Sequence, residues 1–260
     1  MPDILGWLLD PINWSGPEGI PSRLIEHLQI CLLAVGTATA IGLPVGLYVG
    51  HTGRFAGLAI NLANIGRAVP SYALMVGILP IALNLAPSVG YDPDLGLTFL
   101  PLFLAMTLLA IPPILVATYA GLREVDRDLI EAGRGMGLTE RQILGRLEVP
   151  LAVPVIIGGF RTSTLQVIAT ATIGAILSFG GLGRFIIDGL ANKDDAMLFA
   201  GAVLVTVLAL LVDAVLAVVQ RVLTPRALRG KPAPRRPSDD DDEDRIDPAM
   251  FGVRTVDVSA

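Results

Sequence analysis

A row of polar side chains interrupts one of the long apolar segments of this chain. Thr162, Gln166 and Thr170 recur at intervals of four residues, so a helix would place them on one face. Polar side chains within membrane spans face the interior of a helix bundle, because exposure to lipid is costly. We therefore interpret the row as part of a path for a polar solute or of a subunit interface. Arg161 could attract a carboxylate there, but we favour a structural pairing with carbonyl groups or with an acid on another segment.

The composition places this row in an integral membrane protein. The 260 residues are 53% hydrophobic and 17% charged, with a mean hydropathy of +0.66. A bilayer core of about 30 Å needs roughly 20 apolar residues in a helix. We predict an all-α bundle of five transmembrane helices, with six crossings or a re-entrant piece as alternatives because 55–65 is also apolar. The five predicted spans are 28–49, 68–85, 97–117, 149–177 and 197–219.

The distribution of Lys and Arg predicts the orientation of the bundle. The loop over 122–148 carries five arginines, and further basic residues follow the last span, so both belong on the cytoplasmic side. The stretch 87–96 and the start of the chain lack basic residues and belong outside. We expect an extracytoplasmic segment over 1–23, a membrane domain over 24–222 and a disordered, acidic cytoplasmic tail over 223–260.

Several classes of function find no support in the sequence. A G-x-x-x-x-G-K-[ST] phosphate loop is absent, so we expect no ATP hydrolysis by this chain and no cofactor. Cys31 is the only cysteine, and His27 and His51 lie at opposite ends of the first span as interfacial residues, so we expect no metal site. No basic patch indicates nucleic acid. A secondary carrier remains an alternative, although the intramembrane acids on which ion-coupled carriers rely are scarce, with Asp213 as the clear case. A membrane-embedded enzyme and a structural scaffold fit less well.

The cytoplasmic loop is predicted to contain two short helices. Asp128 with Glu131 three residues later fits a helix start, and Gly137 can adopt the left-handed conformation that ends a helix. Thr139 with Gln142 fits a second capping box, and Pro150 sets off the following span. The apolar residues of these helices are too many for two short helices alone in water. They need a partner surface or the underside of the bundle.

The loop resembles the cytoplasmic signature of the membrane subunits of binding-protein-dependent ABC importers. That signature is Glu-Ala-Ala, three residues, Gly, nine residues, then Ile-x-Leu-Pro. The chain keeps its spacing, with Gly133 for the second Ala, Leu147 for Ile and Val149 for Leu. The resemblance implies a type I importer-like bundle whose coupling helix contacts a separate ATPase subunit. The implied coupling residues are Glu131, Ala132, Gly133, Gly137, Leu147 and Pro150.

Further passages are similar to the osmoprotectant branch of that family, which imports glycine betaine, choline, carnitine and related quaternary amines. They are 67–71, 119–126, 158–162, 169–175 and 180–183. The first places Ser71 at the start of the second span, and we add Ser71 to the possible translocation path. The resemblance implies a bacterial inner-membrane protein that works with a second permease, identical or similar, and an extracytoplasmic substrate-binding protein. A permease for methionine or another amino acid is the alternative.

Overall fold

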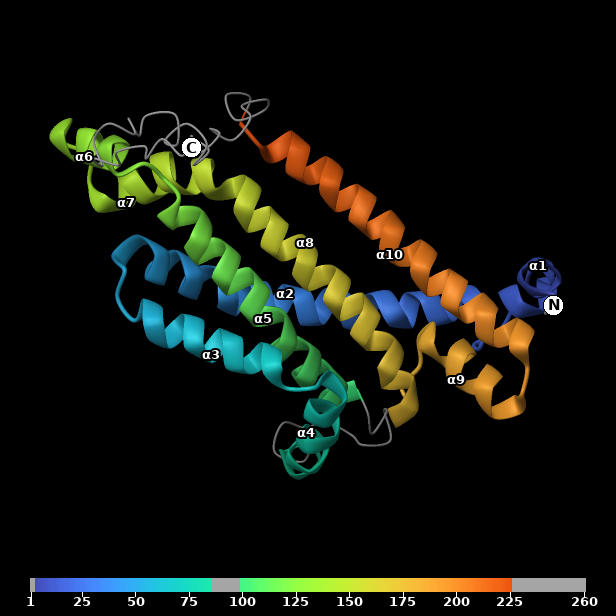
Figure 1. The fold of residues 1–260 in the computed structure, drawn as a ribbon. Helices are drawn as coiled ribbons and strands as arrows, with labels where there is room; N and C mark the ends of the chain where they lie inside the picture. Colours follow the sequence, from blue (N-terminus) through green and yellow to red (C-terminus); the bar gives the residue numbers. More distant parts are fainter. Residues whose placement is uncertain (1–2, 86–98, 226–260) are drawn as a thin grey trace, which may run out of the picture. The chain divides into compact units, whose positions relative to one another are not determined.

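The computed structural model describes residues 3–85 and 99–225, and every regular element in these ranges is helical (Figure 1). The predicted outer loop over 87–96 and nearly all of the predicted tail lie outside the described residues. In chain order the elements are α1 (Ile4–Leu9), η1 (Pro11–Trp14), α2 (Ile20–Thr52), α3 (Ala56–Ala68), α4 (Ser71–Leu85), α5 (Phe99–Arg123), α6 (Arg127–Gly135), α7 (Glu140–Ile143), η4 (Leu144–Glu148), α8 (Val149–Ile173), η5 (Gly174–Leu177), α9 (Gly183–Asn192) and α10 (Asp195–Leu223).

Four helices of the described chain are long and apolar enough to cross a membrane. They span 20–52, 99–123, 140–177 and 195–223; three of them contain a predicted span, and the helix over 99–123 covers 99–117 of the span predicted over 97–117. The first begins at Ile20, inside the segment that we predicted as extracytoplasmic over 1–23. The all-α membrane bundle is thus confirmed, with longer helices than the apolar runs alone indicated.

The predicted second span over 68–85 is one arm of a bent pair. Its residues 71–85 form α4, which meets the preceding α3 at an angle of 96°. Val69 adopts an extended conformation at the break, as expected for a residue before a proline, here Pro70. The apolar stretch over 55–65 therefore belongs to the same bent pair, and the described chain has four spans, or five if that pair counts as one.

Small residues allow the central helices α2 and α5 to approach closely. Ala34, Ala38, Gly42 and Gly46 recur every four residues along α2, and all are buried. A Cβ atom at Gly46 would lie 2.7 Å from the Cβ of Thr118 on α5, so a side chain there would force the helices apart. This arrangement is the close backbone packing that membrane helices use where apolar burial alone gives no driving force.

Helix α8 packs on the other side of α5 by the same device. A Cβ atom at Gly159 would lie 2.2 Å from the Cβ of Ala117 and 2.8 Å from the Pro113 carbonyl oxygen. The buried hydroxyl of Ser163 donates a hydrogen bond of 2.9 Å to the carbonyl of Ala110. In Figure 1, α6 and α7 lie together at one end of α5 and α8, and α9 lies at the other end of α8, beside α10. The second helix of the polar loop and the polar row of α8 are therefore parts of one continuous helix over 140–177.

Candidate functional site: a cytoplasmic elbow and an intramembrane ion pair

The predicted coupling loop folds as a compact turn of two helices, residues 126–148, which we call the elbow. Helix α6 begins at Asp126, whose side chain accepts a hydrogen bond of 2.9 Å from the Asp128 backbone N–H. The predicted helix start at Asp128 was therefore wrong by two residues, because Asp126 offers the same cap one step outside the helix. Gly137 has a φ of +83°, as predicted for the residue that ends α6.

Two backbone bonds close the turn after α6. The Gly137 N–H donates to the Arg134 carbonyl at 2.9 Å, and the Leu138 N–H donates to the Gly133 carbonyl at 3.1 Å. This pair of bonds is the Schellman arrangement, which satisfies carbonyl groups left open at a helix end. It brings Leu138 back over Gly133, where a Cβ atom would lie 3.5 Å from the Leu138 Cδ1. The turn therefore has one well-defined geometry.

The second helix of the elbow continues into the membrane without a break. The predicted capping box of Thr139 and Gln142 is confirmed, with the Thr139 N–H donating to Gln142 Oε1 at 2.9 Å. From there the helix runs over 140–177 through the π-helical turn η4. We expected Pro150 to start a separate segment. A proline is tolerated in the first turn of a helix, because the N–H that it lacks would have no partner there. Here the π-helical turn η4 precedes Pro150, and the helix continues through it although Pro150 has no N–H.

The signature positions divide into an exposed and a buried set. Glu131 and Ala132 lie exposed on α6, as does Gly137 at its end. Gly133 is buried, and a Cβ atom there would lie 2.9 Å from the Leu147 Cδ1. Leu147 itself is half-buried, as is Pro150. Two of the three departures from the signature, Gly133 for Ala and Leu147 for Ile, thus lie against each other, and the smaller residue makes room for the longer side chain.

The exposed face of the elbow carries apolar side chains. Met136 is 76% exposed and Leu129 is 41% exposed. Glu131, two residues after Leu129, is also exposed but lies on another face of α6. Exposed apolar side chains such as Leu129 and Met136 are suited to contact with another protein rather than with water.

A network of ionic contacts holds the elbow together. Arg134 donates to both carboxylate oxygens of Glu140, at 2.9 and 3.1 Å. The Arg134 guanidinium lowers the pKa of the Glu140 carboxyl below its ordinary value, and Glu140 in turn raises the pKa of Arg134. Both groups are solvent-exposed, so the pair fixes geometry more than it adds stability.

A second contact joins the elbow to the end of α2. His51 Nδ1 lies 2.6 Å from Glu148 Oε2, and His51 Nε2 lies 3.4 Å from Glu140 Oε2. The Glu148 side chain is only 6% exposed and that of His51 15%, so this contact is largely shielded from water. Beside it, a polar pocket of about 250 Å³ opens between α2, α5 and α6, with Arg127 and Glu131 in its wall. These side-chain contacts therefore join the end of α2 to the elbow.

Within the membrane-spanning part, Arg161 of α8 pairs with Asp213 of α10. The guanidinium Nε and Nη2 each donate to one carboxylate oxygen, so the pair is bidentate. The two side chains are 34% and 27% exposed, and both line a groove between α8 and α10 with a volume of about 810 Å³. The structural pairing that we favoured for Arg161 is confirmed, and its partner is the acid that stood out in the last span.

The remaining residues of the predicted path do not form one surface. Thr162 is exposed and lines the α8–α10 groove beside Arg161. Gln166 is half-buried and Thr170 is buried, and neither lines the groove. Ser71 is half-buried at the first position of α4, on a different element. The exposure of the three polar residues in the α8 row therefore decreases from Thr162, which is open, to Thr170, which is packed.

Sequence reasoning missed the contact of His51 with Glu148. The two residues are separated by 97 positions, and no local pattern links them. The available signal was a histidine in the last turn of the first span, at the end that the charge distribution predicts to share a side with the acidic residues of the loop. His27, which we expected at the membrane interface, is fully buried inside the bundle.

Comparison with known proteins gives a family for most of the chain. Residues 42–229 match the family described as binding-protein-dependent transport system inner membrane component. The glycine betaine/carnitine/choline transport system permease protein OpuCB of Bacillus subtilis (strain 168) is 36% identical over 205 residues, which are 79% of this chain and 88% of that protein. The osmoprotectant import permease protein OsmW of Salmonella typhimurium is 34% identical over 227 residues, which are 87% of this chain and all of that protein.

Solved structures share the fold. A chain of the MetNI methionine ABC transporter in an inward-facing conformation aligns with a TM-score of 0.68 and 24% identity, over 86% of this chain and 100% of that one. An amino acid ABC transporter solved with histidines aligns with a TM-score of 0.64 and 19% identity, over 85% and 99% of the two chains. At these identities the likeness establishes the helical architecture only.

Proposed function

The chain belongs to the family of binding-protein-dependent transport system inner membrane components, and we propose that it is the permease subunit of an ATP-driven importer of quaternary-amine osmoprotectants. The observation that carries the coupling role is the elbow, which exposes Glu131, Leu129 and Met136 and whose second helix continues as one helix into the membrane. The substrate class rests on the named relatives, all of them permeases for glycine betaine, choline, carnitine or osmoprotectants.

The elbow is the proposed contact to a separate ATPase subunit. Glu131 would supply the charged contact, and Ala132 would allow close approach of the partner. Gly133, Gly137 and Leu147 act within the elbow, where they set its turn and its packing, and Pro150 follows the elbow at the start of α8. The exposed side chains of Leu129 and Met136 support this role, because they need an apolar cover.

Motion of the elbow can reach the membrane by two routes. The first is the continuous helix over 140–177, which carries Arg161 and Thr162 in its membrane part. The second is the contact of His51 with Glu148, which passes the motion to α2. A displacement driven by ATP binding to the partner would therefore shift α2 and α8 together. In this proposal, such shifts alternate the access of the path between the two sides of the membrane.

For the translocation path we propose Arg161, Thr162, Gln166, Thr170 and Ser71, with the α8–α10 groove as its best-defined part. The bidentate pair offers opposite charges side by side, which matches a zwitterion with a carboxylate and a quaternary ammonium. The rest of the groove is mostly apolar and suits the methyl groups of such a solute. An ion-coupled carrier is less well supported, because the buried carboxylates on which such carriers rely are scarce in the spans of this chain.

The proposal includes three partners and an orientation. They are the ATPase subunit, a second permease that is identical or similar, and an extracytoplasmic substrate-binding protein. The chain would sit in the bacterial inner membrane with its N-terminus outside and the elbow and C-terminus in the cytoplasm. The charge distribution in the loops supports this orientation.

Uptake measurements test the substrate class directly. The complete complex is reconstituted in vesicles, and ATP-dependent uptake of radiolabelled glycine betaine, choline and methionine is compared. We expect uptake of at least one quaternary amine and none of methionine. The double variant Arg161→Met with Asp213→Leu removes the charge pair without leaving a single buried charge. It should reduce betaine uptake more than choline uptake, because choline has no carboxylate. Methionine uptake without quaternary-amine uptake would overturn the assignment.

A further inference from the structure

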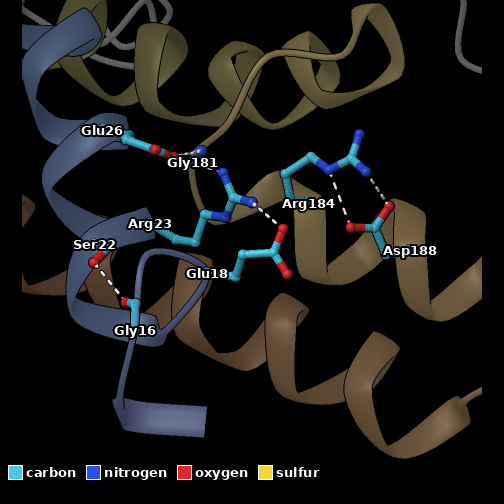
Figure 2. A network of polar contacts seen from close by, with 8 residues as sticks. All are labelled: Gly16, Glu18, Ser22, Arg23, Glu26, Gly181, Arg184 and Asp188. Carbon is cyan, nitrogen blue, oxygen red and sulfur yellow. Dashed lines mark hydrogen bonds and ion pairs between the residues drawn. The ribbon is translucent and has the colours of Figure 1, made fainter.

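The end of the bundle opposite the elbow contains a glycine-rich loop that is fastened to α2. This loop, residues 178–182, joins η5 to α9. Figure 2 shows Gly181 facing Glu26 and Arg23 of α2. The Gly181 N–H donates to Glu26 Oε2 at 2.8 Å, and Arg23 Nη1 donates to the same oxygen at 3.0 Å. The carboxylate thus receives one bond from the loop and one from its own helix.

The loop residues leave room for this bond. A Cβ atom at Gly180 would lie 2.1 Å from Glu26 Oε2 and 2.9 Å from Arg23 Nη1. A side chain at that position would therefore displace the carboxylate. Gly181 has a φ of +80°, which side-chain-bearing residues rarely adopt. Both glycines are needed for Glu26 to reach the backbone of the loop.

The loop also covers a buried polar side chain. His27 is fully buried next to Gly181, where a Cβ atom would lie 3.2 Å from His27 Nδ1. The His27 ring approaches the backbone of Ile168, but neither ring nitrogen makes a hydrogen bond of good geometry among the described residues. An unsatisfied buried donor or acceptor favours any movement that exposes it to water. Leu182, the last loop residue, is only 1% exposed and packs into the core. Burial of Leu182 thus holds the loop closed, whereas opening of the loop would let water hydrate the His27 ring.

We propose that Glu26 is a positioning residue for transport. Its carboxylate, oriented by Arg23, fastens the 178–182 loop to α2, so that the far ends of α2 and α8 move as one body. The effect on transport rests on the function proposed above, whereas the fastening itself does not. Loss of the carboxylate frees the loop and uncouples this end of α8 from α2.

Hydrogen exchange of the assembled transporter tests the fastening. The observable is the exchange rate of the backbone amides in peptides that cover 178–183. Glu26→Ala should speed this exchange roughly ten- to a hundredfold, because a charge-assisted hydrogen bond is lost. Glu26→Gln keeps an oxygen that can accept the Gly181 N–H and loses the charge, so its effect should be smaller.

A nearby ion pair supplies the matched control. Arg184 and Asp188 pair within α9, one turn apart, as Figure 2 shows. Asp188→Asn removes an ion pair of this same end of the bundle without touching Glu26. It should leave the exchange of the loop unchanged. Equal exchange in Glu26→Ala and Asp188→Asn would overturn the proposal.

A second pair of variants tests the same contact from the loop side. Gly180→Ala should speed loop exchange as Glu26→Ala does, because its Cβ would occupy the place of the carboxylate. In the Glu26→Ala background, Gly180→Ala should add little, since the clash is gone. Contacts that couple two residues give this non-additivity. Additive effects of the two substitutions would contradict a direct contact.

The transport readout separates positioning from mere structure. In vesicles, Glu26→Ala should lower the maximal rate of betaine uptake several-fold with little change in the half-saturating concentration, and Asp188→Asn should change neither. Faster loop exchange with an unchanged maximal rate would overturn the positioning role. A complex that transports no quaternary amine would overturn the proposed function, while the exchange experiment would still decide whether Glu26 fastens the loop.

Discussion

Truncation of Glu148 to alanine should release the elbow from the end of α2. The Glu148 carboxylate is 6% exposed and lies 2.6 Å from His51 Nδ1, so the substitution removes a shielded hydrogen bond between residues that are 97 positions apart. Hydrogen bonds to charged groups contribute roughly 1.5–3 kcal/mol. At about 1.4 kcal/mol for each factor of ten, opening of the elbow should become roughly 10- to 150-fold more frequent. The contact of His51 with Glu140 at 3.4 Å survives and favours the lower end of that range.

Hydrogen exchange of peptides within 127–148 measures this opening in the assembled complex. Glu148→Gln should have a smaller effect, because its amide oxygen can still accept from His51. Glu140→Gln is the milder comparison: its carboxylate is 56% exposed, so loss of its pairing with Arg134 should raise exchange by at most roughly fivefold. ATP hydrolysis that continues without solute uptake in Glu148→Ala would indicate that the elbow moves without α2. Equal exchange in Glu148→Ala and Glu140→Gln would refute the reasoning.

Three further predictions concern the elbow and the core. Gly133→Ala should lower the melting temperature in the parent chain, because overpacking against Leu147 outweighs a helix-propensity gain of up to about 1 kcal/mol. In a Leu147→Ala background the same substitution should raise the melting temperature. A lowered melting temperature in both backgrounds would contradict the contact. Because Arg134 lowers the pKa of Glu140, their pairing stabilises the elbow above the ordinary carboxyl value of 4.5 and is lost as pH falls through the lowered value; the parent should therefore lose elbow protection below that value more steeply than Glu140→Gln, and equal acid profiles would contradict this pair. Ser163→Ala should destabilise the bundle by roughly 0.6–1.5 kcal/mol in chemical unfolding, since the Ala110 carbonyl loses its side-chain donor; no measurable loss would show that the bond is not formed.

Sequence patterns predicted the elements of the elbow well because its turns depend on local chemistry. Gly137 and the capping box at Thr139 act within a few residues of themselves, so their spacing in the chain is their spacing in the fold. The start of α6 moved from Asp128 to Asp126 because two nearby acids could each serve as the cap. Apolar run length likewise predicted the long spans, although helices extend beyond the apolar core of the bilayer and so exceeded the predicted limits.

The contacts that join distant elements could not be predicted in the same way. The sequence marked Arg161 and Asp213 separately as costly charges in the membrane, but their pairing depends on how α8 packs against α10. The contact of Glu26 with Gly181 spans 155 positions and requires a loop geometry that only the fold provides. The bend between α3 and α4 differs from these contacts, because Pro70 restricts Val69 locally, whereas the angle of 96° depends on how the two helices pack.

The role of the elbow as the contact to a separate ATPase subunit is tested most directly by purification of the complex. The chain is co-expressed with its ATPase subunit and isolated in detergent, and the amount of bound ATPase is measured for the parent and for Glu131→Lys. The account predicts stoichiometric binding by the parent and loss of binding in the variant, with an unchanged helical circular dichroism spectrum, because the exposed side chain of Glu131 takes no part in the packing of the bundle. Full binding by Glu131→Lys, or solute uptake at the full rate without any ATPase subunit, would contradict it.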